Sequence, residues 1–367
     1  MLRKRFSRRK LLATVLPAAA ATPLVRPFGA AAADSMQMCS ADHGAGMAMA
    51  MPAATMAVGE AVPAPGGPHD LDHLLYPPEP RAHRPGRVRE YSVMAMNREI
   101  EIAHGVKFDA WTYNGTVPGP VIRASEDDVL RVRFENAATH PHTMHFHGIH
   151  PADMDGVNME TPPGGVFYYE FRARPAGMHL YHCHSLPLAE HISRGLYGAF
   201  IVDPPAERPK ARELVMILSA FDTDGDYAND VYAMNGRAFY YTRYPIKVRR
   251  SETVRIYLAN VTEYDLINSF HVHGEMFRLY RTGTTAEYEY TDIVTLGQGE
   301  RCIVEIDFHN PGLFMFHAHQ SRFADRGAMG WFDVADDGPS EAAVRGASGR
   351  VGRGEGSQLG DKAITKY

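Results

Sequence analysis

Residues 177–198 read GMHLYHCHSLPLAEHISRGLYG, and residues 312–330 repeat this pattern as GLFMFHAHQSRFADRGAMG. In each stretch a glycine lies five residues before the first histidine of an H-x-H pair, and a G-x-x-G motif follows. Self-similarity of this kind within one chain indicates two copies of one structural unit. Each copy has short apolar stretches separated by turn residues, which predicts β-strands.

The repeat extends toward the N-terminus of each copy. An Asn-Gly pair is followed by a segment in which polar and apolar residues alternate, and then by another H-x-H pair with a glycine behind it. Such alternation is typical of half-buried strands. The matching segments are Asn114-Gly115 with residues 120–139 and Asn235-Gly236 with residues 245–262, then HFHG at 145–148 and HVHG at 271–274.

We therefore expect an all-β fold made of two tandem β-sandwich domains. The first domain should span residues 88–204 and the second residues 210–335, with a short linker between them. A chain of 367 residues is long enough for two domains of this size.

Residues 1–33 resemble an export signal. The sequence SRRKLL at residues 7–12 is similar to the twin-arginine motif, a short apolar segment follows it, and residues 30–33 offer an A-x-A cleavage site. We expect this segment to be removed and the mature protein to be periplasmic or secreted by the twin-arginine route.

Two further segments are expected to be disordered because their composition offers little to bury. Residues 34–87 are rich in Ala, Pro, Gly and Met, and residues 336–367 are rich in Gly, Ser and charge. The first segment contains soft donors, which favour copper(I). It is either a copper-gathering tail or a linker whose methionines are incidental. The donors are Met36, Met38, Cys39, His43, Met47, Met49, Met51 and Met56.

Charge and apolar content exclude several classes of protein. The chain has a net charge of −5, and it becomes more acidic once the basic signal is removed, so nucleic acid and anionic membranes are unsuitable partners. No apolar run long enough to span a membrane follows the signal. Three cysteines, Cys39, Cys183 and Cys302, are too few for a disulfide framework, and Cys302 lies in an apolar run typical of a buried core.

Cys183 lies between two histidines in the predicted strand. Neighbouring side chains of a strand point to opposite faces, so Cys183 faces one way while His182 and His184 face the other. Eight residues later, His191 can return to the Cys183 side. A thiolate with imidazoles and a weak or absent axial ligand is the pattern of blue-copper electron-transfer sites. The competing interpretation is a buried free cysteine among chance histidines.

Strand parity adds His142 to this group. It lies five residues before His147 and so on the opposite face from His145 and His147, toward Cys183. The second unit has Asn268 and Ala318 at the corresponding positions and no histidine after His319, so only the first unit should hold a mononuclear site. Five residues beyond His191, Leu196 is the expected axial neighbour; because it cannot coordinate, it should raise the reduction potential.

Four H-x-H pairs recur at matching places in the two units. Residues i and i+2 of a strand share a face, as joint metal coordination requires. Eight imidazoles without a carboxylate suit copper better than magnesium or calcium, and structural zinc would gain nothing from the redox thiolate beside it. The pairs are His145/His147, His182/His184, His271/His273 and His317/His319.

With these motifs assembled, the chain resembles two-domain, laccase-like multicopper oxidases over nearly all of residues 88–335. The motifs are N-G-x-x-P-G-P, H-F-H-G, D-G, H-C-H and the final H-x-H. The resemblance implies two tandem cupredoxin-like Greek-key β-sandwich domains and four copper ions per chain. It assigns type 1 copper to His142, Cys183 and His191, type 2 copper to His145 and His271, and the type 3 pair to His147, His182, His184, His273, His317 and His319.

The same resemblance implies an activity. Type 1 copper takes single electrons from a small reducing substrate, such as a phenol, an aromatic amine or a metal ion, and passes them through Cys183 to a trinuclear cluster that reduces O2 to water. Asp155 of the D-G motif would assist proton delivery; alternatively it only caps the turn before Gly156. Asp153 is a weaker candidate for that role. The family also implies a homotrimer whose clusters form between neighbouring chains.

Two other functions compete with this one. A copper nitrite reductase shares the fold and the type 1 site, but that family carries its catalytic aspartate where this chain has His145, and no ligand where it has His184. A periplasmic copper-binding or storage protein could use the Met-rich tail, yet it has no need of a thiolate between two histidines.

Overall fold

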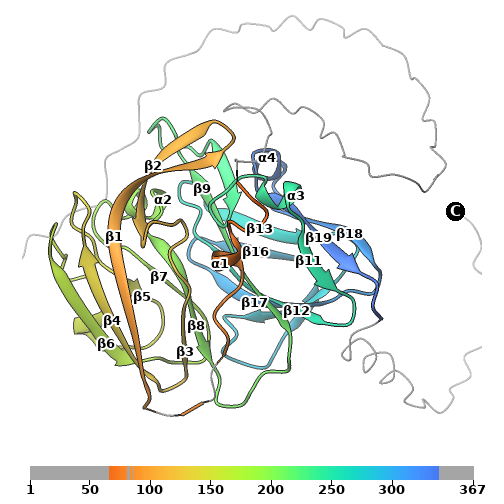
Figure 1. The fold of residues 1–367 in the computed structure, drawn as a ribbon, viewed down its shortest axis with the longest axis horizontal. Coiled ribbons are helices and arrows are strands. Elements are labelled where there is room, and N and C mark those ends of the chain that lie inside the picture. The colour runs from red at the N-terminus through yellow and green to blue at the C-terminus, as the bar shows by residue number, and fades with distance from the viewer. Residues whose placement is uncertain (1–65, 81–82, 85, 339–367) are drawn as a thin grey trace, which may run out of the picture. The chain divides into compact units, whose positions relative to one another are not determined.

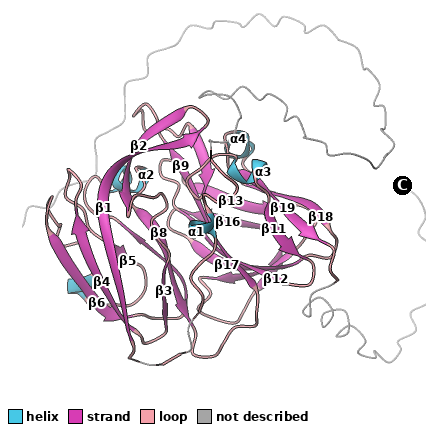
Figure 2. Cartoon of the chain, viewed as in Figure 1, coloured by secondary structure: helices cyan, strands magenta, loops and turns pink. Residues whose placement is uncertain are grey.

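The computed structural model describes residues 66–80, 83–84 and 86–338, and strands form nearly all of their regular structure (Figure 2). The fold is all-β, with two tandem cupredoxin-like Greek-key sandwiches, as predicted. Strands β1–β8, orange to green in Figure 1, form the first sandwich, and strands β9–β19, green to blue, form the second. No helix in the described ranges is long and apolar enough to cross a membrane.

The first sandwich consists of two four-stranded sheets, in the orders β2-β1-β4-β6 and β3-β8-β7-β5. Strands β1 and β4 run parallel, as do β3 and β8, while the other neighbours are antiparallel. The strands are β1 (Val88–Ala103), β2 (Val106–Tyr113), β3 (Ile122–Ser125), β4 (Val129–Asn136), β5 (His145–Phe146), β6 (Val166–Arg172), β7 (Gly177–His182) and β8 (Tyr197–Asp203).

The second sandwich repeats this order as β10-β9-β12-β17 and β11-β19-β18-β13 and adds β14, β15 and β16 at the sheet edges. This insertion could not be predicted from the repeat, because it has no counterpart in the first unit. The strands are β9 (Arg212–Phe221), β10 (Val231–Met234), β11 (Ile246–Arg249), β12 (Thr253–Asn260), β13 (Ile267–Val272), β14 (Phe277–Arg281), β15 (Glu289–Thr291), β16 (Ile293–Gly297), β17 (Arg301–Asp307), β18 (Gly312–His317) and β19 (Met329–Ala335).

Short helices occupy the connections. Helices α2 (Leu188–Ser193) and α4 (Ser321–Asp325) lie at equivalent points of the two copies, between β7 and β8 and between β18 and β19. The others are α1 (Asp72–Leu75), α3 (Tyr240–Arg243) and the 3-10 helix η1 (Ala152–Met154).

The repeated Asn-Gly pairs form matching turns. Asn114 and Gly115 have φ of 55° and 78°, and Asn235 and Gly236 have φ of 53° and 79°. Left-handed φ at both central residues defines the type I′ turn, for which Asn-Gly is the preferred sequence. Each asparagine side chain also bonds the backbone of the neighbouring strand, β1 in the first copy and β9 in the second.

Apolar packing joins the two sandwiches. Each sandwich has its own core, and a third buried cluster combines residues of both, such as Leu180 of the first and Tyr257 of the second. Cys302 is fully buried in the core of the second sandwich, in line with its apolar surroundings in the sequence.

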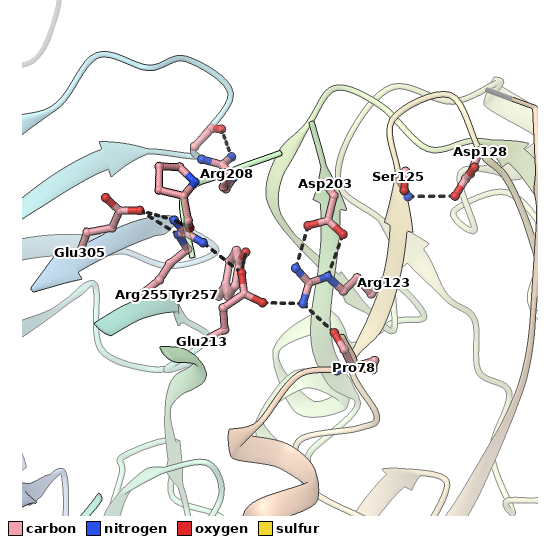
Figure 3. Close-up of polar contacts among 12 residues, drawn as sticks. Pro78, Arg123, Ser125, Asp128, Asp203, Arg208, Glu213, Arg255, Tyr257 and Glu305 are labelled. Carbon is pink, nitrogen blue, oxygen red and sulfur yellow. Dashed lines mark hydrogen bonds and ion pairs between the residues drawn. The ribbon is translucent and has the colours of Figure 1, made fainter. Parts of the chain in front are cut away.

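A buried ion-pair network also crosses between the sandwiches (Figure 3). The guanidinium of Arg123 donates twice to Asp203, at 2.8 Å each, and once to Glu213 at 2.7 Å. Glu213 in turn accepts hydrogen bonds from Arg255 at 3.2 Å and from the Tyr257 hydroxyl at 2.8 Å. The start of β9 is thereby held to strands β3 and β8 of the first sandwich.

Part of the segment expected to be disordered is ordered. Residues 66–76 include α1, and Leu71, Leu74 and Leu75 are buried in the core of the second sandwich. The expectation for residues 34–87 is therefore wrong over this stretch, because three leucines spaced i, i+3, i+4 form one apolar face. Residues 1–65, including the export signal, Cys39 and the Met-rich group, and residues 339–367 lie outside the described ranges.

Candidate metal centres

The structure brings His142, Cys183 and His191 together in the first sandwich. The Cys183 Sγ lies 3.2 Å from Nδ1 of His191 and 3.8 Å from Nδ1 of His142, and the two Nδ1 atoms are 3.1 Å apart. All three side chains are buried. A metal about 2.0–2.3 Å from each donor fits these separations, as in a trigonal His2Cys site.

Backbone contacts hold this group in position. Cys183 follows β7, and its N–H donates to the carbonyl of Leu196, which is fully buried in the same core. The N–H of Thr143 donates to Sγ at 3.4 Å. His142 exchanges two backbone hydrogen bonds with Thr161, while α2 carries His191 back to the thiol.

Burial controls protonation of these donors. Desolvation lowers the pKa of His142 to about 3 and also lowers the pKa of His191, so both imidazoles are neutral and keep a free lone pair at neutral pH. Desolvation raises the pKa of the Cys183 thiol, against hydrogen bonds from Ser185 and Thr143. A bound metal would supply the positive charge that such a thiolate needs.

The corresponding place in the second sandwich contains no such donors. Asn268 and Ala318 are both fully buried there. The helix equivalent to α2 presents Phe323, whose ring stacks on Tyr232 at a centroid distance of 4.1 Å. An aromatic pair packed beside Ala318 thus lies where the first sandwich has its thiol site.

Four imidazoles gather beyond the opposite face of β7. His145 and His182 are register partners of β5 and β7, and Nε2 of His147 lies 3.1 Å from Nε2 of His182. The His184 ring centroid is 5.2 Å from that of His145. Desolvation lowers the pKa of His147 to about 3 and of His182 to about 4, which favours the neutral, metal-binding form.

The second sandwich repeats this arrangement. His271 and His317 are register partners of β13 and β18, and Nε2 of His273 lies 2.9 Å from Nε2 of His317. The His319 ring centroid is 5.2 Å from that of His271. Burial lowers the pKa of His273 and of His317 as well.

Backbone carbonyls orient several of these rings. Nδ1 of His182 donates to the carbonyl of Cys183 at 2.8 Å, and Nδ1 of His317 donates to the carbonyl of Ala318 at 2.7 Å. With Nδ1 occupied, Nε2 is left to face its partner imidazole. Fixing the tautomer in this way is what metal-binding histidines require.

A carboxylate accompanies one imidazole in each half. Nδ1 of His145 donates to the carbonyl of Asp155 at 2.9 Å, and an Asp155 carboxylate oxygen lies 3.1 Å away. Nδ1 of His271 donates to the carbonyl of Asp292 at 2.7 Å, with the Asp292 carboxylate at 3.8 Å. Asp155 belongs to the D-G motif of the sequence, whereas Asp292 belongs to no motif and comes close only through the added strands.

The two imidazole groups stay separate within one chain. Among the described residues, every cluster of metal-ligating side chains draws on one sandwich only. Each of these two groups of four imidazoles, one per sandwich, is therefore called a half-site below.

Sequence analysis also missed the tryptophan beside the thiol site. The ring centroid of Trp111 lies 4.7 Å from that of His191 and 5.2 Å from that of His142. It comes from β2, far from both histidines in the sequence, so no local motif could have revealed it.

The chain is similar to known copper proteins in both sequence and structure. Residues 95–207 and residues 209–338 match two sequence models of the multicopper oxidase family. A crystal structure of a multicopper oxidase is 47% identical with a TM-score of 0.69, over 72% of this chain and 97% of that one. The blue copper oxidase from Nitrosomonas europaea is 28% identical with a TM-score of 0.62, over 68% and 86% of the two chains.

Nitrite reductases are also similar. The copper-containing nitrite reductase of Neisseria meningitidis is 29% identical over 280 residues, which cover 70% of this chain and 72% of that protein.

Proposed function

Because the chain belongs to the multicopper oxidase family, we propose that it couples one-electron oxidations of a reducing substrate to the four-electron reduction of O2 to water. The family implies copper, and the donor sets present suit it. We assign type 1 copper to His142, Cys183 and His191, type 2 copper to His145 and His271, and the type 3 pair to His147, His182, His184, His273, His317 and His319. Copper there would take single electrons from the substrate and supply them to O2.

One relationship carries this proposal. The thiol of Cys183 belongs to the buried three-donor group, while its chain neighbours His182 and His184 belong to the imidazole group on the other face. The two sites are thus joined through the backbone and side chains of three consecutive residues. A copper-storage protein would gain nothing from this connection.

Asp155 supports the same reaction as a proton carrier. Its carboxylate is partly exposed and lies beside His145, so it can take a proton from solvent and hold it next to the imidazole group. His150 lies between this carboxylate and the backbone, with Nε2 at 3.6 Å from Asp155 and 2.7 Å from the Phe146 carbonyl.

The separation of the half-sites supports assembly into a closed ring. Eight imidazoles can meet only if the first sandwich of one chain faces the second sandwich of its neighbour, a heterologous contact that a homotrimer closes. Exposed apolar side chains lie near both groups of imidazoles in the sequence, and an interface between chains could bury them. They are Ile149, Val157, Leu266, Ile267 and Met276. Sedimentation of the copper-loaded protein tests this; a stable monomer with a complete cluster contradicts it.

Nitrite reduction is the competing function, favoured by the similarity to the Neisseria enzyme. The four H-x-H pairs favour the oxidase. The test is to count copper per chain, record absorption and spin-resonance spectra, and measure O2 uptake with phenol, aromatic amine and metal-ion donors. Four coppers, one blue and one type 2 signal and O2 uptake support the oxidase. Two coppers with anaerobic nitrite consumption support the reductase.

Cys183→Ser separates the oxidase from a storage role. The oxidase loses its blue band and turnover while keeping most of the other copper, whereas copper storage would change little. We further propose export by the twin-arginine route to the periplasm or beyond, which a reporter fused to residues 1–33 would test.

A further inference from the structure

The thiol site is closed to direct contact with an electron donor. His142 and Cys183 have no exposed surface, and His191 is only 3% exposed. A donor in solvent therefore has to pass its electron through a neighbouring group, and the structure identifies which group that is.

Trp111 is the aromatic side chain that connects this site with the surface. Its ring centroid lies 4.7 Å from that of His191, and 4.8 Å from that of His140 at an interplanar angle of 33°. Trp111 is itself buried, whereas His140 is exposed. The contacts thus run from solvent to His140, then to Trp111, and then to a ligand of the site.

The indole is held firmly against the helix that carries His191. The backbone N–H of Trp111 donates to the carbonyl of Arg194 at 2.9 Å, one residue beyond the end of α2. The Arg194 guanidinium lies over the indole at 5.2 Å from its centroid and is paired with Glu190 at 3.1 Å. These contacts place the Trp111 ring between the Arg194 guanidinium and the site that contains His191.

The second sandwich provides an internal comparison. Its residue in the position of Trp111 is Tyr232, which stacks on Phe323. The loop before β13 carries Glu263, Tyr264 and Asp265 instead of a histidine. The exposed histidine and the tryptophan thus occur together only in the sandwich with the thiol site.

We propose that His140 and Trp111 form the electron-uptake face of the protein. A flat aromatic donor stacks on the exposed imidazole of His140, and one electron crosses the Trp111 ring to the metal held by Cys183, His142 and His191. The donor is oxidised by one electron and the metal is reduced by one, with no bond made or broken. This inference rests on the proposed oxidase function and names its class of donor and its path.

The test is anaerobic reduction of the copper-loaded protein by tetramethyl-p-phenylenediamine, an aromatic amine that loses one electron without a proton. Bleaching of the blue band is followed by stopped flow in Trp111→Leu and His140→Ala. Trp331→Phe, which alters the other of the two tryptophans, is the matched control. Copper content, absorption and reduction potential are measured for each variant.

We expect bleaching to slow roughly tenfold in Trp111→Leu, equivalent to about 1.4 kcal/mol in the barrier, with unchanged copper content and potential. His140→Ala should need more donor for the same rate, and Trp331→Phe should behave as wild type. Wild-type rates in Trp111→Leu would overturn the proposal. The proposal would also be overturned if the bleaching rate changed only as far as a shifted reduction potential explains. Trp111 would then tune the potential of the site without conducting the electron.

A second measurement needs no turnover. In metal-free Trp331→Phe, Trp111 is the single tryptophan and can be excited selectively over tyrosine, and Cu(II) binding should quench its emission because the ring adjoins His191. Unquenched emission at full copper occupancy would remove Trp111 from the path. Normal bleaching without O2 uptake in the wild type would instead contradict the oxidase function and leave the uptake face standing.

Discussion

The ring of Tyr232 stacks on that of Phe323 with centroids 4.1 Å apart and planes 14° from parallel. In the first sandwich the equivalent strand position sets Trp111 against His191. In the second copy an aromatic pair packed beside Ala318 and Ala328 thus lies where the first copy has Trp111 and His191.

Phe323→Ala should therefore lower stability without affecting the blue centre. Removing a buried phenyl group costs about 3–5 kcal/mol, and Phe323 is 7% exposed. Chemical denaturation measures the loss, and Leu313→Ala, at a site 56% exposed, is the control. Equal stability of the two variants, or a lost blue band in Phe323→Ala, would contradict this assignment.

Asp155→Asn should slow O2 reduction by roughly 100-fold, the contribution of a positioned proton carrier. Copper content and anaerobic bleaching should not change, because Asn can still cap the turn. Asp153→Asn, two residues away and exposed, is the control and should turn over normally. If Asp155 only caps the turn, both variants will show normal turnover.

Arg123→Met should destabilise the protein by about 3–5 kcal/mol, because it leaves the Asp203 carboxylate without its partner and removes one of the two arginines that pair with Glu213. Arg131→Met is the matched control: Arg131 pairs with Glu90 and Glu170 at the surface, where solvent screens the charges and the pairs contribute little to stability. Thermal unfolding of both variants gives the comparison. A similar small loss in each would mean that the network contributes nothing to holding the sandwiches together.

Gly236→Ala should be far more damaging than Gly105→Ala. Both glycines have left-handed φ, 79° and 71°, so both substitutions carry backbone strain of about 1 kcal/mol. Only at Gly236 would the new Cβ meet backbone, 2.1 Å from the carbonyl oxygen of Val117 in the other sandwich. Soluble yield and melting temperature report the difference, and matching values would argue against this close approach.

Stability should depend on pH through Glu263. Burial raises the pKa of its carboxyl from 4.5 to about 7, so folding favours the protonated form. Stability is then fully present below pH 4.5 and falls as the pH rises through 7. The full shift corresponds to about 3 kcal/mol, which solvent screening of this partly exposed carboxyl reduces to about 2 kcal/mol. Glu263→Gln should match wild type at pH 4 and exceed it at pH 8, and Glu263→Asp should keep the wild-type slope. If the free energies of unfolding of Glu263→Gln and wild type differed by the same amount from pH 4 to pH 8, Glu263 would not be the group responsible for the pH dependence.

Strand periodicity accounts for most of what could be predicted from the sequence. The five-residue offset from His147 identified His142 as a neighbour of Cys183, and their donor atoms lie 3.8 Å apart. The repeat likewise identified Asn268 and Ala318 as the residues that break the pattern in the second copy. His142 lies just before β5 and Cys183 just after β7, so here the alternation expected for a strand predicts a shared face beyond the strand ends.

Contacts between distant segments could not be predicted in this way. Trp111 and His140 come from different strands and connections, and Asp292 reaches His271 through an insertion that the repeat does not contain. The order around Leu71 depends on the core of the second sandwich, which lies far along the chain. Composition alone suggested disorder there, because composition does not record which apolar surface is available for packing.

The separation of the two imidazole groups has a consequence for metal retention. The Cys183 site is complete within one chain, so its affinity for copper should not vary with protein concentration. The cluster that we propose to be shared between chains would obey mass action, so dilution would release its metal as the proposed ring dissociates. Under the proposed oxidase function, diluting the protein should therefore abolish oxidase activity while the blue colour is retained.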